Sequence, residues 1–516
     1  MDFDATELAK LTRHIEENIR TSGNAGLEFL DPRNYAARLT TKQNHLVYGR
    51  RGAGKSTLMK SLQKEGKHLA IFCNLETFKD IPFPNILVKV LIATLVGLNG
   101  ELAKTRKWYR VGGAKARLQK IVKKEIATLT QKLDEPVAGE KRVTTTTSMT
   151  AMKKSCAGIQ AGVAGAEAGV AQTKGKGETH GTEVRENISV DKLASLRTEI
   201  SRYQDIFTKA SKLMSAKPIF LILDDFYFIP KAIQPDLLDY FHRLTKGTPL
   251  FLKVATIKHR SRVYKQTEQS YVGVEPGHDI LPIDMDYTLD RFDELKNFMA
   301  DLLRAASKGA GASVEIDSLF SGDGFNQLCI ASGGVPRDFL ALFVDLADDL
   351  SPADGKGIGK IEVTKAAIGK HGDKLSSMKS DSAEEKEVLD FYLNNIKRTV
   401  YTDKRTNAFL VAKPDLENHP QSRQAIRELV DLRLLHLIES STSSAPSDGR
   451  RYEAYLIDLG LYDNDRPRSF NQITPGSRDK KARKDSLRSS PRLSLPDIET
   501  AVSLETEAKL EITPSN

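Results

Sequence analysis

The sequence contains little cysteine: its 516 residues include three, Cys73, Cys156 and Cys329. Their number is odd and none belongs to a CxxC pair, so the sequence predicts neither a disulfide framework nor a cysteine-based zinc site. Thiols that are so few and so scattered suit a reducing compartment, and we expect a cytoplasmic location.

Long apolar runs are also missing. The longest, residues 86–98, is shorter than the roughly 20 residues that span a bilayer, and Lys89 interrupts it. The first residues, Met1 to Asp4, are acidic and lack the basic and apolar regions of a secretory signal. We therefore expect no transmembrane helix and no membrane partner.

Charge of one sign does not dominate. Lys and Arg number 77 against 68 Asp and Glu, which gives a net charge of +9, and ten of those basic residues against seven acidic ones lie in residues 466–516. A mildly basic chain permits nucleic-acid contact without requiring it. Hydrophobic residues make up 40% of the chain, so most of it can bury a core, divided over about three domains.

Short β-rich runs at residues 46–48, 69–73, 219–223 and 250–256 alternate with helical patterns. This alternation predicts the α/β class, with a mostly parallel sheet, for a core unit over residues 1–288. The core carries an insertion at 100–210, which is first helical and basic and then rich in Gly, Ala and Thr. A flexible surface arm is one interpretation of its second part, and a hairpin is the other.

Three further segments follow the core. Apolar residues at helical spacing predict an all-helical lid over 289–370. Residues 382–463 show two helical patterns and then two strands joined by a turn at Asp448-Gly449, which is typical of a winged-helix domain. The Pro-, Ser-, Lys- and Arg-rich residues 464–516 are predicted to be a disordered tail.

The strongest motif lies between Gly49 and Ser56, where the sequence matches G-x-x-x-x-G-K-[ST] directly after an apolar strand and before a helix. Glycines let such a loop wrap phosphates with its backbone amides, while Lys55 reaches the β- and γ-phosphates and Ser56 holds Mg²⁺. The predicted phosphate-binding residues are Gly49, Arg50, Arg51, Gly52, Ala53, Gly54, Lys55, Ser56 and Thr57.

A second element completes a nucleotide site. The apolar run 219–223 ends in Asp224 and Asp225, as expected of a Walker B strand. We expect Asp224 to hold Mg²⁺ and Asp225 to orient the attacking water. Many ATPases carry Glu at the second position; because Asp225 is one methylene shorter, hydrolysis is predicted to be slow.

Two other sites place polar groups near the phosphates. Thr256 ends the next strand, where residues of a parallel sheet face the ligand, and it can sense the γ-phosphate. Arg260 and Arg262 follow it, either as charge-stabilising fingers or as solvated surface residues. Arg337 follows Gly333-Gly334-Val335-Pro336 at a helix start, from which it can reach across a cleft to the γ-phosphate.

In this order, the glycine-rich loop, the strand ending in Asp224-Asp225, Thr256 and the Gly333-to-Arg337 motif before a winged helix resemble the AAA+ ATPases, nearest their origin-recognition and initiator branch. The resemblance implies that Lys55 and Ser56 bind ATP and Mg²⁺. It also implies that Thr256 is sensor 1 and Arg337 is sensor 2. Members often assemble into homo- or hetero-oligomers on ATP binding, and P-loop switches of the STAND type share much of the arrangement.

The function of the C-terminal module stays open. With Ile426, Leu429 and Val430 inward, helix 421–432 turns Arg423, Gln424 and Arg427 outward together with two carboxylates, so double-stranded DNA and a protein partner are both candidates. The sequence thus predicts an ATP-dependent switch. It is either a DNA-associated ATPase or a signalling or defence NTPase whose insertion at 100–210 contacts a protein partner. A small-molecule kinase explains neither the lid arginine nor the winged helix.

Overall fold

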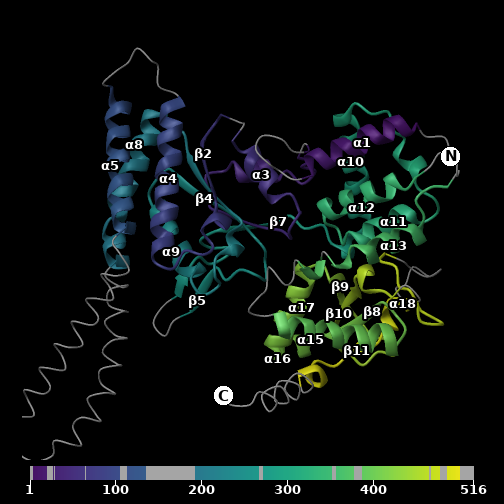
Figure 1. Ribbon diagram of the computed structural model, residues 1–516. Helices are drawn as coiled ribbons and strands as arrows, with labels where there is room; N and C mark the ends of the chain where they lie inside the picture. Colours follow the sequence, from purple (N-terminus) through teal and green to yellow (C-terminus); the bar gives the residue numbers. More distant parts are fainter. Residues whose placement is uncertain are drawn as a thin grey trace, which may run out of the picture.

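The computed structural model describes residues 4–19, 27, 29–63, 66–104, 113–134, 192–266, 271–350, 356–372, 374–376, 386–463, 466–476 and 485–499. Figure 1 shows two lobes side by side: an α/β unit, and a second lobe in which a helical unit lies above a C-terminal unit. The expected α/β class with helical additions is confirmed.

A five-stranded sheet forms the centre of the α/β unit. Its strand order is β2-β3-β4-β1-β7, and all the pairings are parallel. The strands are β1 (His45–Tyr48), β2 (Leu69–Asn74), β3 (Ile219–Asp224), β4 (Leu250–Thr256) and β7 (Leu281–Asp284). Every residue of β3 is buried, because helices cover both faces of a parallel sheet.

The two faces of the sheet pack against different helices. Leu221 and Leu223 of β3 join the apolar cluster of α4 (Asn85–Lys104), α5 (Ala114–Asp134), α8 (Ile200–Leu213) and α9 (Gln234–Thr245). Phe220 and Ile222 point the other way, toward α2 (Tyr35–Leu39) and α3 (Lys55–Ser61). This period of two is the pleat of a strand. Figure 1 shows α4, α5 and α8 side by side on the far side of the sheet from α3.

The first part of the insertion is helical, as predicted, since α5 packs on α4 and α8. Arg202 of α8 pairs with Glu125 of α5, and Lys132 lies 2.7 Å from Glu199. The Gly-, Ala- and Thr-rich residues 144–181 lie outside the described residues. The 20-residue α4 is long and apolar enough to cross a membrane, longer than the expected apolar run, yet half of its apolar segment is buried inside the fold. Its Ile86, Leu91 and Leu95 are fully buried, which is typical of a core helix.

The helical unit contains η3 (Leu289–Arg291), α10 (Phe292–Ala310), η4 (Ile316–Leu319), α11 (Gly324–Ala331), α12 (Pro336–Asp348) and α13 (Lys360–Gly369). It also includes α1 (Ala5–Asn18), which packs on α10 and α12 through Leu8, Leu11 and Ile15. The assignment of residues 1–20 to the core unit was therefore wrong. The apolar spacing of α1 identifies a helix with one buried face but does not identify what covers it.

The C-terminal unit contains α15 (Lys386–Ile396), the π-helical η6 (Lys397–Asp403), α16 (Lys413–Asn418), α17 (Pro420–Asp431), η7 (Leu459–Leu461) and α18 (Asp485–Arg488). Its sheet has the order β11-β8-β10-β9, formed by β8 (Ala408–Ala412), β9 (Leu435–Thr442), β10 (Tyr452–Ile457) and β11 (Arg492–Leu493). Of these strands, β9 and β10 form the expected antiparallel hairpin.

The prediction of a disordered tail was wrong for two stretches beyond residue 463. In one, β11 pairs in parallel with β8, and Leu493, Leu495 and Ile498 are buried. In the other, Ile473 exchanges hydrogen bonds with Asn407, at 2.7 and 3.0 Å. Composition hid this because a few apolar residues suffice once a free strand edge offers backbone partners. The short hairpin of β5 (Tyr264–Gln266) and β6 (Tyr271–Gly273) was also not predicted.

Candidate nucleotide site between the core and the helical unit

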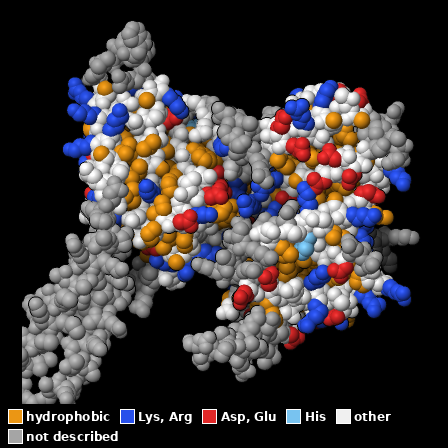
Figure 2. Space-filling view, viewed as in Figure 1, with side chains coloured by type: hydrophobic (Ala, Val, Ile, Leu, Met, Phe, Trp, Pro, Cys, Tyr) orange, Lys and Arg blue, Asp and Glu red, His pale blue; other side chains and the backbone are white. Residues whose placement is uncertain are grey.

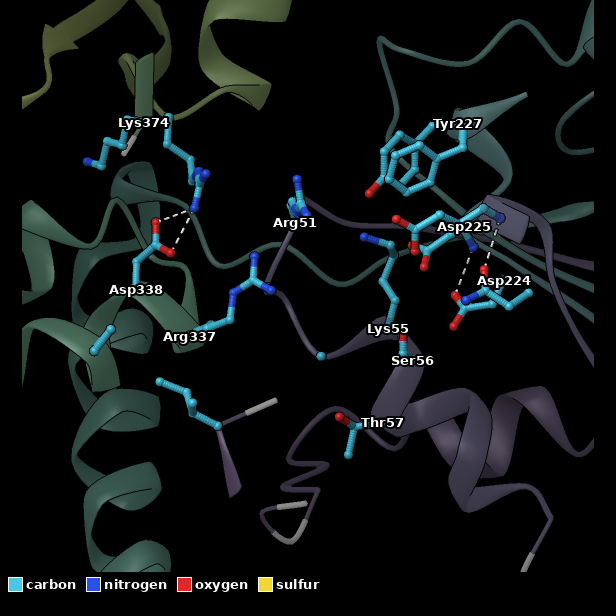
Figure 3. A pocket seen from close by; sticks show the side chains of 18 of the residues that line it. Arg51, Lys55, Ser56, Thr57, Asp224, Asp225, Tyr227, Arg337, Asp338 and Lys374 are labelled. Atoms are coloured by element: carbon cyan, nitrogen blue, oxygen red, sulfur yellow. Dashed lines mark hydrogen bonds and ion pairs between the residues drawn. The ribbon is translucent and has the colours of Figure 1, made fainter. Parts of the chain in front are cut away.

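A cavity of 860 Å³, the central cavity, opens at the carboxyl ends of the core strands and is bounded on its other side by the helical unit. Figure 3 shows the side chains that line it, and Figure 2 shows Lys and Arg side chains gathered where the two lobes meet. The charged lining residues are Arg51, Lys55, Lys60, Glu76, Asp224, Asp225, Arg337, Asp338, Lys370, Lys374 and Arg433. Such a site suits a polar ligand with several negative charges.

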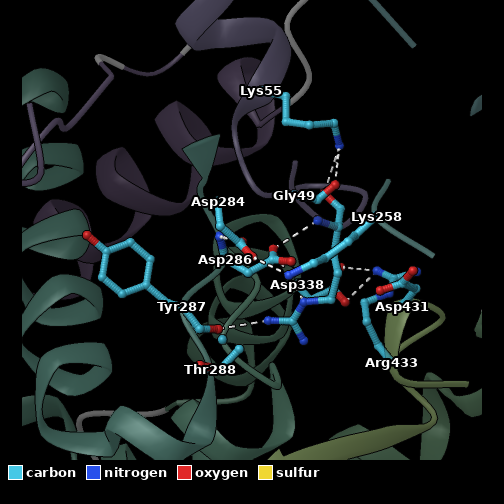
Figure 4. Close-up of polar contacts among 12 residues, drawn as sticks. Gly49, Lys55, Lys258, Asp284, Asp286, Tyr287, Thr288, Asp338, Asp431 and Arg433 are labelled. Carbon is cyan, nitrogen blue, oxygen red and sulfur yellow. Dashed lines mark hydrogen bonds and ion pairs between the residues drawn. The ribbon is translucent and has the colours of Figure 1, made fainter. Parts of the chain in front are cut away.

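The glycine-rich loop lies between β1 and α3, as the motif requires. Gly52 and Gly54 both have φ near +91°, a backbone conformation that side chains disfavour. Lys55, the first residue of α3, is buried, and its Nζ donates to the carbonyl oxygens of Gly49 at 2.6 Å and Arg50 at 3.1 Å (Figure 4). Burial lowers the pKa of Lys55, while the carboxylate of Asp224 opposes that shift.

The loop residues divide by position. Arg51, Gly52, Gly54, Lys55, Ser56 and Thr57 line the central cavity, whereas Gly49, Arg50 and Ala53 are not among its lining residues. The Arg50 side chain contacts the connection to the helical unit: Nη2 donates to the carbonyl of Tyr287 at 2.8 Å, and Nε lies 3.5 Å from Asp286. Asp286 also accepts from the Arg50 amide at 2.8 Å. Arg50 therefore ties the loop to the residues that lead into the lid.

The helical unit touches the loop at Gly52. The Arg337 amide lies 3.4 Å from the carbonyl oxygen of Gly52, and a Cβ on Gly52 would come within 2.9 Å of Arg337 Cβ. Arg337 stands in the first turn of α12, as predicted, and lines the central cavity. Burial lowers the pKa of Arg337, while the charge of the neighbouring Asp338 opposes that shift. A half-buried cation beside a phosphate-type loop is suited to an anion.

Asp224 and Asp225 follow β3 into the same cavity. Asp224 is buried, lies near the Ser56 hydroxyl, which opposes the rise of its pKa, and accepts a hydrogen bond from the Asp225 amide at 3.0 Å. Burial raises the pKa of Asp224. For Asp225, burial and then the charge of Asp224 raise the pKa to about 6. A carboxylic acid that titrates near neutral pH can act as a proton acceptor.

These residues also fit a magnesium ion. A hydroxyl and a carboxylate, those of Ser56 and Asp224, line the same cavity, and Mg²⁺ prefers oxygen ligands of this kind. Within the described part of the chain, no cluster of three or more His, Cys, Asp or Glu side chains forms a complete cation site. A magnesium ion here would take its remaining ligands from water and phosphate oxygens, as it commonly does.

Three further predicted residues, beyond the loop, also lie outside the lining of the cavity. Thr256 is fully buried at the end of β4, and its hydroxyl is hydrogen-bonded to Ser261, while its carbonyl accepts from the Gly49 amide at 3.2 Å. Arg260 lies 5.4 Å from the ring centroid of Tyr227, which itself lines the cavity. The Arg262 amide donates to Gln234 at 2.6 Å. Their roles as sensor 1 and as arginine fingers remain predictions.

The sequence did not predict that residues from the C-terminal half of the chain line the central cavity. Arg433 lines the central cavity, and its Nη1 donates to both carboxylate oxygens of Asp338, at 2.7 and 2.5 Å. Lys374 also lines it and pairs with the buried Asp458 at 2.7 Å. Arg433 and Asp338 are 95 positions apart, so a single sequence holds no signal for their pairing.

Helix α17, which was considered for DNA contact, docks on the core. Gln424 donates to the carbonyl of His259 at 2.7 Å, and Asp431 accepts from the His259 amide at 3.0 Å. Glu428 is buried and lies 2.9 Å from Lys231 of the core. The expected outward residue Arg427 instead donates to both oxygens of Glu453 on β10. The polar face of α17 is thus largely occupied within the molecule.

One known family matches the part of the chain that contains Asp224, Asp225 and Thr256. Residues 182–323 match the family model described as ORC-CDC6-like. The chain carries an ORC-CDC6-like segment. That segment includes Asp224, Asp225 and Thr256, and it confirms the resemblance to origin-recognition AAA+ ATPases over these residues. It ends before Arg337 and begins after the glycine-rich loop, which therefore rest on their own motifs and geometry.

Two solved structures are similar at low identity. They are a structure of Drosophila ORC bound to DNA and one of the Aeropyrum pernix ORC1 protein in complex with DNA, each 12% identical to this chain. The alignments cover 89% of this chain, with 92% and 91% of the two relatives, at TM-scores of 0.34 and 0.31. These scores are low, and the α/β assignment rests on the strand order of the parallel sheet and the helices that cover it. Among curated protein sequences, none matches this chain.

Proposed function

We propose that the protein is an ATP-dependent switch of the AAA+ type. The observation that carries the proposal is the convergence of Lys55 and Asp224 from the core with Arg337 from the helical unit around one cavity. A nucleotide bound there would contact the core and the helical unit at once, so its binding would stabilise one arrangement of the two units. This is the requirement for a ligand that shifts a conformational equilibrium.

The phosphates would lie where the loop amides and the N-terminus of α3 meet, with Lys55 exchanging its carbonyl partners for phosphate oxygens. Ser56 and Asp224 would hold Mg²⁺, which supplies charge neutralisation to the phosphates. Asp225 would accept a proton from the attacking water. The short Asp side chain supports slow hydrolysis, as a switch needs a long-lived ATP state.

Double-stranded DNA is the proposed partner of the ATP form. Arg117, Lys120, Lys123 and Lys124 are exposed on α5. Figure 2 shows Lys and Arg side chains along the edge of the molecule where α5 lies. Glu125, on the same helix, is buried and paired with Arg202. A stripe of cations without exposed carboxylates among them suits a phosphate backbone. The winged-helix assignment of the C-terminal unit is part of the same proposal.

A second candidate is a STAND-like signalling or defence NTPase, whose C-terminal unit and insertion contact protein partners. The docking of α17 on His259 and Lys231 favours it, because a helix held against the core presents little to DNA until it is released. In both candidates ATP promotes assembly with other subunits, to which Arg260 and Arg262 would contribute as arginine fingers.

The ATP site is tested by calorimetry on the full chain with Lys55→Ala. Loss of the lysine removes the main charge at the phosphates, so we expect ATP affinity to fall at least a hundredfold. Lys89→Ala, on an exposed position of α4, should bind as the wild type does. Unchanged affinity in Lys55→Ala would refute the site.

The two candidate functions are separated by titrating duplex DNA with and without ATP at several salt concentrations, together with a mass measurement of the assembly. Salt-dependent DNA affinity that increases with ATP supports the DNA-associated switch. ATP-driven assembly without DNA affinity supports the signalling switch and excludes the first candidate.

A further inference from the structure

Arg433 lines the central cavity, and its side chain is only partly paired. Nη1 makes both contacts to Asp338, whereas Nε is buried without a partner. The residue is 7% exposed. A buried guanidinium nitrogen without a partner destabilises the folded state, because it has lost its hydrogen bonds to water and gained none in the protein. The position of Arg433 therefore requires an explanation beyond the ion pair.

The backbone of Arg433 is fixed by the end of α17. Its φ is +66°, in the left-handed region, and its amide donates to Val430 at 3.0 Å while the next amide donates to Leu429 at 2.9 Å. A non-glycine residue in this conformation carries strain that the fold must offset. The turn after the helix thereby places one long cation of the C-terminal unit in the lining of a cavity that residues of the other two units also line.

The surroundings of Arg433 are those of an anion site. Asp338, which holds Arg433, is the residue next to Arg337, and Arg51 also lines the cavity. The charge of Arg433 is one of the influences that lower the pKa of Arg337, after burial, so the two guanidinium groups lie close enough to repel each other. An anion between them would relieve this repulsion, and a single carboxylate relieves only part of it.

We propose that Arg433 is a nucleotide-contacting residue that exchanges Asp338 for the terminal phosphate of ATP. The inference rests on the proposed ATP site and adds a residue from the C-terminal unit to it. Arg337 and Arg433 then approach the same phosphate from the lid and from α17. Residues of α17 also contact His259 and Lys231 of the core. A movement of Arg433 toward the third phosphate would therefore alter how the C-terminal unit docks on the core.

The test compares ATP with ADP on the full chain, using fluorescent analogues of both and a non-hydrolysable ATP. Arg433→Gln should weaken ATP binding about tenfold or more and leave ADP binding within about twofold. Asp338→Asn removes the competing carboxylate, so it should strengthen ATP binding relative to ADP. Arg427→Gln is the matched control, since it breaks another arginine–carboxylate pair of α17 that lies outside the cavity.

The opposite signs separate this proposal from a structural role. If the pair only held two units together, Arg433→Gln and Asp338→Asn would change the ATP-to-ADP ratio in the same direction or not at all, and either result would overturn the proposal. If the wild type binds neither ATP nor ADP, the ATP site itself is refuted. Thermal melts without nucleotide check that each variant is folded. If Arg433→Gln does not fold, the ratio of ATP to ADP affinity of Asp338→Asn still tests the proposal.

Discussion

The imidazole ring of His436, on β9, lies directly against the backbone of Gly333, so that a Cβ on Gly333 would come within 2.3 Å of His436 Cε1. Its Nε2 lies 2.8 Å from Asp458, which is also paired with Lys374. Although burial opposes ionisation, Lys374 and His436 hold the pKa of Asp458 below its ordinary value. The turn before Arg337 is thus in contact with a buried ionic group of the C-terminal unit.

Gly333→Ala should destabilise the protein by about 2–4 kcal/mol, measured by denaturant unfolding without nucleotide. About 1 kcal/mol comes from the left-handed backbone, and the remainder comes from overlap with His436. Gly322→Ala is the control, because Gly322 also has positive φ but has nothing within 4 Å of the added carbon. Equal losses in both variants would show that His436 does not constrain the turn.

Asp225→Asn should keep ATP affinity within about twofold and lower the rate of ATP hydrolysis at least a hundredfold, because an amide cannot accept the proton of the attacking water. The measurement is phosphate release under single-turnover conditions. Asp236→Asn, on α9, should hydrolyse ATP at the wild-type rate. Wild-type hydrolysis in Asp225→Asn would remove this residue from the mechanism.

Hydrolysis by the wild type should also depend on pH near neutrality. The pKa of Asp225 is raised to about 6, so this group loses its negative charge as the pH falls below that value. We expect the hydrolysis rate to fall about tenfold for each pH unit below 6 and to level off above 7. A rate that is flat between pH 5 and 7 would exclude Asp225 as the proton acceptor.

Arg337→Ala should lower ATP affinity about tenfold and abolish the protection from protease that ATP confers on the helical unit. The reason is that Arg337 is the lid cation beside Gly52. Arg304→Ala, on the exposed side of α10, is the control. Equal protease protection of the wild type with and without ATP would show that nucleotide does not close this lid.

Lys231→Met should release α17 from the core, because it leaves the buried carboxylate of Glu428 without its amine partner. A loss of about 1–2 kcal/mol in docking would raise the affinity for duplex DNA about five- to thirtyfold. Lys246→Met, at an exposed pair with Asp279, should have no effect. Unchanged DNA affinity together with faster hydrogen exchange in α17 would show that the released helix does not read DNA.

The sequence predicted the phosphate loop, the paired aspartates and the lid arginine because each is a local pattern. A glycine-rich turn between a strand and a helix fixes where backbone amides point, and an apolar strand that ends in carboxylates fixes which edge of the sheet they reach. The strands of the C-terminal unit were also predictable, since alternation and turn residues are local. The packed tail was not, because its few apolar residues are buried only when β8 offers an edge.

By itself, the sequence determined the α/β core and which residues stand at its carboxyl edge. Only the tertiary structure decided that α1 covers the helical unit, that α17 faces the core, and that Arg433 enters the cavity beside Arg337. These relationships join residues separated by tens to hundreds of positions, and their energies come from burial and from charge pairing across units. Such energies depend on distance in space, which spacing along a chain does not encode.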